Sequence, residues 1–181
     1  MTTVVLCGAE KDDGVSRAME KVLSKFGGVQ RYNGRQLIGS KNGKSPRFLI
    51  YESAHIPMVK NLDGILIFKN SFVPNEREEV PSGLIPVLDA QNSGAAAVLK
   101  GTGCVAISCG MSDRDTLSVA SIDYLSAVVS LQRDLKILTS QILEPHDITI
   151  ALSQEIGVYP LLALCSVLLL SGESSVSGYQ F

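Results

Sequence analysis

Residues 8–16 include the residue types of a loop that binds phosphate. The segment follows a short apolar run and holds two glycines, a lysine and a serine. In a phosphate-binding loop, glycines let backbone N–H groups approach the phosphates, a lysine balances their charge, and a serine or threonine hydroxyl binds magnesium. The candidates for these roles are Gly8, Lys11, Gly14 and Ser16, and the cofactors of such a loop would be ATP and Mg²⁺.

The same segment departs from the usual spacing of a phosphate loop. Its glycines are one residue too far apart for the pattern G-x-x-x-x-G-K-[ST], and Val15 stands where the lysine belongs. Three acids that repel a polyphosphate lie between the glycines, namely Glu10, Asp12 and Asp13. We interpret the segment as the remnant of a phosphate loop, or as a plain turn between a strand and a helix. A cation or a polar neutral group suits it better than a nucleoside triphosphate.

Three further polar residues follow predicted buried strands. They are Glu52, Asn70 and Asp89. Ligands gather at the carboxyl ends of strands in open parallel sheets, so we expect these residues to share one cleft with the loop. A carboxylate at the position of Glu52 could hold magnesium or a water, and the simpler alternative is a polar strand end. For Asp89 the alternative is a helix cap.

The cysteines and histidines give no metal-binding pattern. Cys7, Cys104, Cys109 and Cys165 include no C-x-x-C pair, and the chain has only two histidines. A structural zinc site needs closely spaced ligands, so we expect no metal site. The simpler interpretation is reduced core thiols in a cytoplasmic protein. The residue types and their spacing do not assign a catalytic role to any side chain.

Composition describes a folded α/β-like chain and excludes some partners. The 181 residues are 45% hydrophobic and 19% charged, with a net charge of −2 and no tryptophan. A nucleic-acid binder usually has a basic excess, so we expect no nucleic-acid partner. The most apolar stretch, residues 158–170, is shorter than the about 20 residues of a membrane span. The expected partner is an unknown small molecule or protein, and the oligomeric state, homo-oligomers included, stays open.

The elements that must position these residues alternate between apolar runs and helical patterns. Near-continuous apolar runs predict strands buried on both faces of a parallel sheet. They lie at residues 4–7, 48–51, 65–68, 84–88 and 104–108. Helical patterns cover residues 15–26, a segment from Asp89 to Leu99, and residues 158–170. A short strand is predicted at residues 36–38, and loops are predicted at residues 40–45 and across the charge run 76–79.

The pattern changes after Gly110. Residues 116–122, 127–132 and 148–152 resemble strands without long helices between them, which predicts an antiparallel extension of the sheet. We therefore expect one three-layer α/β domain over residues 1–172, with a mainly parallel sheet. Residues 173–181 are expected to form a short polar tail that frays.

The part of the chain from Cys104 to Gly172 resembles the later part of the central, ATP-binding domain of the Mur ligases. In that family an antiparallel segment follows a strand, and a helix rich in alanine and leucine closes the domain. Here the strand ends at Cys109-Gly110 and the helix spans residues 159–170. The segment 84–89 is similar to the family's strand that contacts the nucleotide, and Asn70 stands where the family has an asparagine.

The sequence departs from the family pattern at residues that the family uses for its reaction. Val15 replaces the loop lysine, Ser71-Phe72-Val73 replaces the Asp-His pair after the asparagine, and Tyr159-Pro160 stands near the family's helix asparagine. The family's flanking domains, for the UDP-sugar substrate and the incoming amino acid, have no counterpart in these residues. Without the loop lysine, most of the stabilisation of a transferring phosphate is lost.

The resemblance therefore implies a stand-alone Mur ligase-like domain that has lost ligase and ATPase chemistry and acts as a binding or regulatory module. One alternative is a nucleotide-dependent, ligase-like enzyme with an altered loop, in which Lys11 replaces the missing lysine. Another is a subunit that works only beside a partner chain carrying the absent domains.

Overall fold

The computed structural model describes residues 1–40, 45–76 and 78–181. The predicted loop at 40–45 and the charge run 76–79 include residues 41–44 and 77, which lie outside the described residues. The strands are β1 Thr2–Cys7, β2 Gly28–Tyr32, β3 Leu37–Ile38, β4 Pro46–Ser53, β5 Gly64–Phe68, β6 Leu84–Asp89, β7 Ile107–Gly110, β8 Leu117–Ile122, β9 Ser126–Leu131, β10 Leu135–Lys136, β11 Ile142–Leu143, β12 His146–Ala151 and β13 Tyr179–Gln180. The helices are α1 Gly14–Phe26, α2 Ser93–Leu99 and α3 Val158–Leu170.

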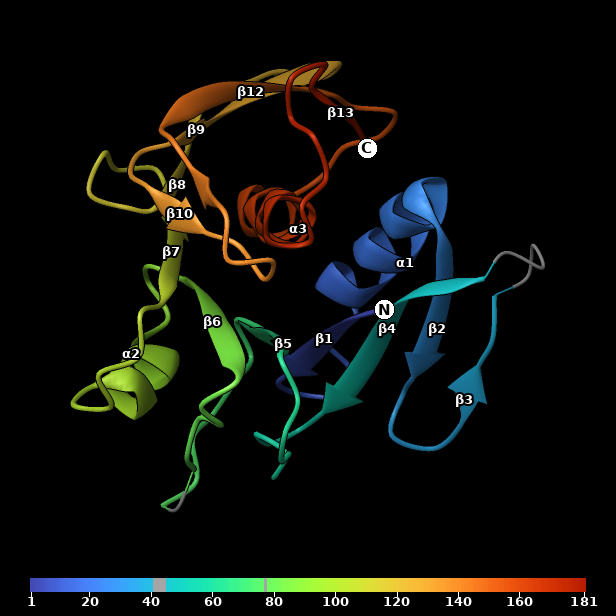
Figure 1. The fold of residues 1–181 in the computed structure, drawn as a ribbon, viewed down its shortest axis with the longest axis vertical. Coiled ribbons are helices and arrows are strands. Elements are labelled where there is room, and N and C mark those ends of the chain that lie inside the picture. Colours follow the sequence, from blue (N-terminus) through green and yellow to red (C-terminus); the bar gives the residue numbers. More distant parts are fainter. Residues whose placement is uncertain (41–44, 77) are drawn as a thin grey trace.

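One mixed sheet organises the described residues (Figure 1). Its order is β13-β12-β9-β8-β7-β6-β5-β1-β4-β2-β3. The central strands from β2 to β8 run parallel, and β9 pairs antiparallel with both β8 and β12. The predicted mainly parallel sheet with an antiparallel extension is confirmed.

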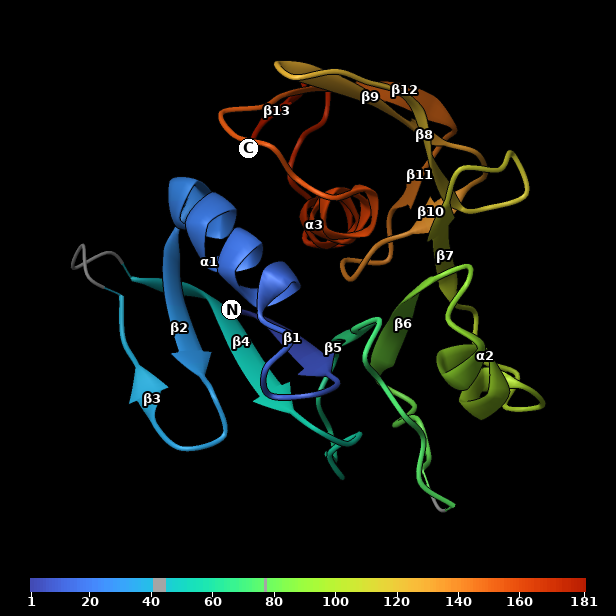
Figure 2. The same cartoon turned by 180° about the vertical axis from the view of Figure 1, so that it is seen from behind.

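The sheet curves around α3, with α1 beside it on the same face and α2 on the opposite face (Figures 1 and 2). Helix α3 is apolar on every side and almost entirely buried, as a helix enclosed by a sheet must be. The largest core cluster joins α3 and α1 to strands from both the parallel part and the extension. A smaller cluster lies under α2. These are the three layers expected from the sequence.

Helix α1 forms where the helical pattern predicts it. Val15, Met19, Val22 and Leu23 recur at helical spacing and are buried against the sheet. The apolar strands β1 and β5 are buried on both faces, which explains their lack of alternation.

Two elements begin three or more residues later than predicted. Strand β7 begins at Ile107 instead of residue 104, because the chain turns at residues 100–102 after α2 and its pairing with β6 starts only at Ile107. Between the two, the Cys104 N–H donates to Thr102 Oγ1. Helix α2 begins at Ser93, and its cap is Asn92, whose Oδ1 accepts the Ala95 N–H at 3.0 Å. Asp89 therefore does not cap this helix. It ends β6 and accepts the Gln91 N–H instead.

The segment 173–181 does not fray. Residues 175–181 lie along β12, from the Ser175 Oγ contact with His146 Nε2 at 2.7 Å to the Phe181 N–H, which donates to the Ala151 carbonyl at 2.8 Å. Gly178 has φ +70, and a Cβ there would lie 2.3 Å from the Thr149 carbonyl oxygen. The tail therefore belongs to the sheet.

No helix among the described residues is both long and apolar enough to cross a membrane.

Candidate ligand-binding cleft at the carboxyl edge of the sheet

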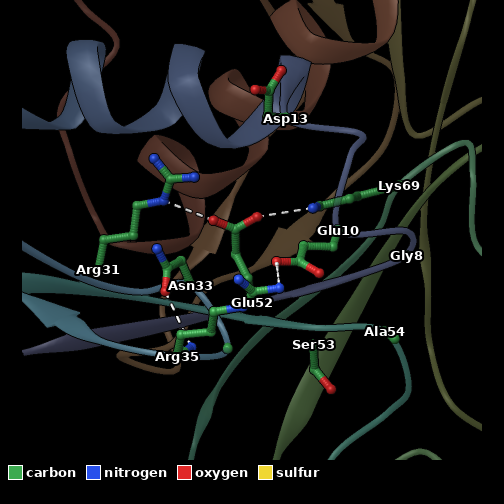
Figure 3. Close-up of a pocket in the computed structure, with 11 residues that line it drawn as sticks. Gly8, Glu10, Asp13, Arg31, Asn33, Arg35, Glu52, Ser53, Ala54 and Lys69 are labelled. Carbon is green, nitrogen blue, oxygen red and sulfur yellow. Dashed lines mark hydrogen bonds and ion pairs between the residues drawn. The ribbon is translucent and has the colours of Figure 1, made fainter.

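A cavity of about 370 Å³ opens at the carboxyl ends of β1, β2, β4 and β5 (Figure 3). Six charged residues line it: Glu10, Asp13, Arg31, Arg35, Glu52 and Lys69. Three are acids and three are bases, so the lining is formally neutral. The remaining wall consists of small or polar residues, including Gly8, Asn33 and Gly34.

Strand alternation explains why these side chains meet. Successive side chains of a strand point to opposite faces, so every second residue faces α1. Arg31 has the same parity as the core residue Val29, Glu52 the same as Ile50, and Lys69 the same as Ile67. Within the sheet, the side chains on this face are apolar and belong to the core. At the edge of the sheet, the next side chain on the same face of each strand is charged.

An ion-pair network forms the floor of the cavity. Lys69 Nζ donates to Glu52 Oε2 at 2.9 Å, and Arg31 Nε donates to Glu52 Oε1 at 2.7 Å (Figure 3). Arg31 Nη1 also donates to Glu20 Oε2 at 2.9 Å, from the side of α1. The Lys69 side chain is only 1% exposed. A buried charge is tolerated where it is paired and hydrogen-bonded, as it is here.

This network shifts the ionisation of its members. Burial raises the pKa of Glu52, but hydrogen bonds from Lys69 and Arg31, together with their charges, outweigh burial and hold that pKa below its usual value. Burial lowers the pKa of Arg31, and the carboxylates of Glu52 and Glu20 more than compensate, so it lies above its usual value. Glu52 is therefore a carboxylate that already has two cationic partners.

Gly8 is required by the close approach of Lys69. It has φ +148, and a Cβ at this position would lie 2.7 Å from Lys69 Cβ and 2.9 Å from Ser71 Oγ. Only glycine avoids both the strained backbone and the clash. The sequence assigns this glycine to phosphate contact, whereas in the structure it makes room for a side chain of the neighbouring strand.

The turn from β1 to α1 is held by Ser71. Ser71 Oγ donates to Asp12 Oδ2 at 2.7 Å and accepts the Ala9 N–H at 3.0 Å. The Ser71 N–H also donates to Asp12 Oδ2, at 3.3 Å. A backbone N–H of the loop and one of its three acids are thus engaged by the protein itself.

The other loop candidates lie away from the cavity. Ser16 is fully buried, and its hydroxyl donates to the Asp13 carbonyl at 3.1 Å. Gly14 starts α1 and is exposed, and Lys11 is exposed as well. Val15, at the position of the missing lysine, is 4% exposed and packs in the core. None of these four residues lines the cavity.

Asn70 and Asp89 form a separate contact at the same edge. Asn70 Nδ2 donates to Asp89 Oδ2 at 3.2 Å, and neither residue lines the cavity. Of the seven candidates from the sequence, the structure brings Gly8 and Glu52 to the cavity. Sequence reasoning missed Arg31 and Lys69, which both pair with Glu52. The signal that could have added Lys69 is its place directly after the apolar run 65–68.

The residues present do not fit magnesium and a phosphate chain. Both Glu52 carboxylate oxygens accept hydrogen bonds from cations, and the Ser16 hydroxyl points into the protein. Among the residues that the structure describes, no group of three or more His, Cys, Asp and Glu side chains is arranged to hold a metal ion. The positive charge that a metal would bring beside Glu52 comes from Lys69 and Arg31.

Comparison with solved structures identifies the fold. The chain is similar to MurF from Acinetobacter baumannii, with a TM-score of 0.56 and 13% identity over 97% of this chain and 44% of that one. It is also similar to the MurF ligase from Thermotoga maritima in complex with ADP, with a TM-score of 0.51 and 13% identity over 96% of this chain and 46% of that one. The chain thus has a Mur ligase-like fold and spans less than half the length of these two proteins.

In sequence, no protein-family model matches the chain, and no curated protein matches it.

Proposed function

We propose that this chain is a Mur ligase-like domain without ligase or ATPase chemistry, and that it serves as a binding or regulatory module. The ligand is a small polar molecule held in the cavity at the carboxyl edge. The observation that carries the proposal is the network of Lys69, Glu52 and Arg31. Glu52 lies at the end of a strand, where a carboxylate could bind a metal ion, but both of its oxygens already accept hydrogen bonds from these two cations.

The state of the loop supports the same conclusion. A phosphate cradle needs several backbone N–H groups that converge on one anion. Here the Ala9 N–H is bound to Ser71, and the Ser16 hydroxyl is bound to Asp13. Glu10 and Asp13 bring negative charge to the cavity wall. A polyphosphate would meet repulsion without the donors that normally offset it.

The main alternative is a nucleotide-dependent enzyme with an altered loop. It is favoured by the second structural neighbour, the MurF ligase from Thermotoga maritima, which is described in complex with ADP. In this chain Lys11 would have to supply the missing charge, although it lies outside the cavity. In a third possibility, the chain is a subunit that works only beside a partner chain carrying the further domains. This is compatible with both functions above. The four free cysteines support a place in the cytoplasm.

Thermal melting with and without Mg-ATP tests the proposal. A ligand that binds the folded state stabilises it by about 2.7 kcal/mol when its concentration exceeds Kd a hundredfold. We expect no shift of Tm with Mg-ATP at millimolar concentration. A reproducible rise would support the alternative and overturn the loss of nucleotide chemistry.

Restoring the lysine tests the loop itself. We expect Val15→Lys to bind ATP no more tightly than about 100 μM, about −5.5 kcal/mol, and to release no phosphate above background. Residue 15 faces the core, so the new ammonium cannot reach a phosphate in the cavity. Val15→Met is the matched control for a long side chain at this position, and circular dichroism checks that both variants fold. Tighter binding together with turnover in Val15→Lys would show a working loop.

A further inference from the structure

We infer that the cavity at the carboxyl edge binds a small polar monocarboxylate, whose carboxylate accepts a hydrogen bond from Lys69 at the floor. This inference rests on the proposed function, because it names the ligand class for the same cavity. The sequence favours a cation or a neutral group at the loop, since it shows three acids there. The structure adds three cations to the lining, and one of them is buried.

The Lys69 ammonium has donors left for a ligand. A lysine ammonium carries three N–H groups. Among the described residues, the hydrogen bond to Glu52 Oε2 is the one that Lys69 Nζ makes. Lys69 lines the cavity, and Figure 3 shows its tip beside Glu52 at the cavity wall. A cation that is 1% exposed needs acceptors for its remaining donors, and an oxygen of a ligand in the cavity supplies one.

Two cations and one carboxylate face the floor of the cavity. Two cations, Lys69 and Arg31, bracket the single carboxylate of Glu52. Glu20 also pairs with Arg31, but it does so from α1 and does not line the cavity. With Glu20 included, the four charges of the network balance. The attraction for a ligand carboxylate therefore comes from the N–H groups of Lys69 that Glu52 does not use, and a low local dielectric strengthens such a hydrogen bond.

The mouth of the cavity limits the ligand to one negative charge. Glu10 lies there with its side chain 68% exposed, and Asp13 is partly exposed. Each has an exposed partner, Arg35 at 3.3 Å from Glu10 and Arg17 beside Asp13, and such exposed pairs are weak. A second anionic group on the ligand would face these two carboxylates and one lining cation, Arg35, so the mouth carries a net negative charge. A phosphate-bearing ligand is therefore disfavoured.

The remaining lining selects a compact, polar body. Gly8, Gly34 and Ala54 are small, and Asn33 and Ser53 are polar. The volume of about 370 Å³ is at the small end of the range for ligand sites. Hydroxyl groups suit this wall better than an aromatic or aliphatic body.

Three probes with one carbon skeleton test the inference by isothermal titration calorimetry at fixed ionic strength. Glycerate has one carboxylate, glycerol has none, and 3-phosphoglycerate carries an additional phosphate. We expect glycerate to bind at least tenfold more tightly than either of the others, as is typical for a charge-assisted hydrogen bond in a shielded site. Equal binding of glycerate and glycerol, or no binding of glycerate, would overturn the inference.

Two variants assign the effect to the floor and the mouth. We expect Lys69→Met to reduce glycerate affinity at least tenfold, with Lys11→Gln as a matched control that removes an exposed lysine outside the cavity. Glu10→Gln tests the mouth without disturbing the buried network. It should raise the affinity for 3-phosphoglycerate several-fold and change that for glycerate by less than twofold. If Lys69→Met does not fold, the Glu10→Gln variant decides. A ratio of 3-phosphoglycerate affinity to glycerate affinity that is the same in Glu10→Gln as in the wild type counts against the inference.

The same titrations separate this inference from the proposed function. If neither Mg-ATP nor glycerate binds, the ligand class is wrong and the loss of nucleotide chemistry stands. If Mg-ATP binds with turnover, the proposed function is wrong whatever glycerate does.

Discussion

Glu52 and Lys69 are the residues on which both the stability of the cleft edge and its chemistry depend. Replacing Glu52 with glutamine leaves the buried Lys69 ammonium without a carboxylate. Breaking one partner of a buried pair is strongly destabilising, so we expect Glu52→Gln to lower the free energy of unfolding by roughly 3 kcal/mol. Urea unfolding measures the change. Glu10→Gln, which breaks an exposed pair, should cost less than about 1 kcal/mol, and similar values for the two variants would contradict a buried network.

The Glu52 carboxylate also contributes to the loss of folding stability in acid. Its folded pKa lies below its usual value because Lys69 and Arg31 stabilise the charged form. A depressed folded pKa stabilises the fold above the unfolded pKa, which is about 4.3 for glutamate, and this stabilisation is lost as pH falls through the folded pKa. The wild type should therefore lose stability below about pH 4.3 more steeply than Glu52→Gln.

Single residues show how far the site could be predicted. Glu52 and Gly8 were found because each directly follows an apolar run that reads as a strand. Lys69 was passed over for Asn70, although Lys69 has the parity of the core-facing residues of β5. A shift of one residue along a strand moves a side chain to the other face of the sheet. In a strand that is apolar on both faces, the sequence does not show which residues face α1. Arg31 was missed because β2 itself was not predicted.

At the scale of elements, the long apolar strands were predictable, and of the two-residue strands only β3 was predicted, within residues 36–38. Strands β1, β4, β5 and β6 lie within two or three residues of their predicted bounds, since their apolar runs are buried whatever their partners. The two-residue strands β10, β11 and β13 have no pattern of their own. They form because a neighbouring segment offers hydrogen-bonding partners, which the local sequence does not show.

Strand β13 is a structural element whose removal should be costly. Tyr179 is 3% exposed, its ring lies 6.1 Å from that of Phe26 and 6.2 Å from that of Phe181, and its hydroxyl donates to the Glu173 carbonyl. We expect Tyr179→Ala to lower the free energy of unfolding by about 3 kcal/mol, measured by urea unfolding. Val176→Ala, three residues away and 94% exposed, should change it by less than about 0.5 kcal/mol. A frayed tail would make both substitutions neutral.

For the whole molecule, the shared core predicts one cooperative unit. One cluster of buried side chains runs from Val4 in β1, through α3, to Ile150 in β12 and on to Phe181. The parallel part of the sheet and its extension therefore share their largest core cluster, and the second cluster, under α2, belongs to the parallel part. We expect unfolding in urea to give a single transition, coincident by circular dichroism and by tyrosine fluorescence. Two separated transitions would show that the extension is a domain of its own.

The course of the segment 173–181 has a consequence for the protein in a crowded solution. An uncovered strand at the edge of a sheet offers free N–H and C=O groups on which another chain can build, and this is a common route to aggregation. Residues 175–181 occupy that position beside β12, and β3 does the same beside β2. What remains at each end of the sheet is a strand of two residues, too short to template growth. The tail that the sequence predicts to fray thus covers part of the edge at which another chain could pair.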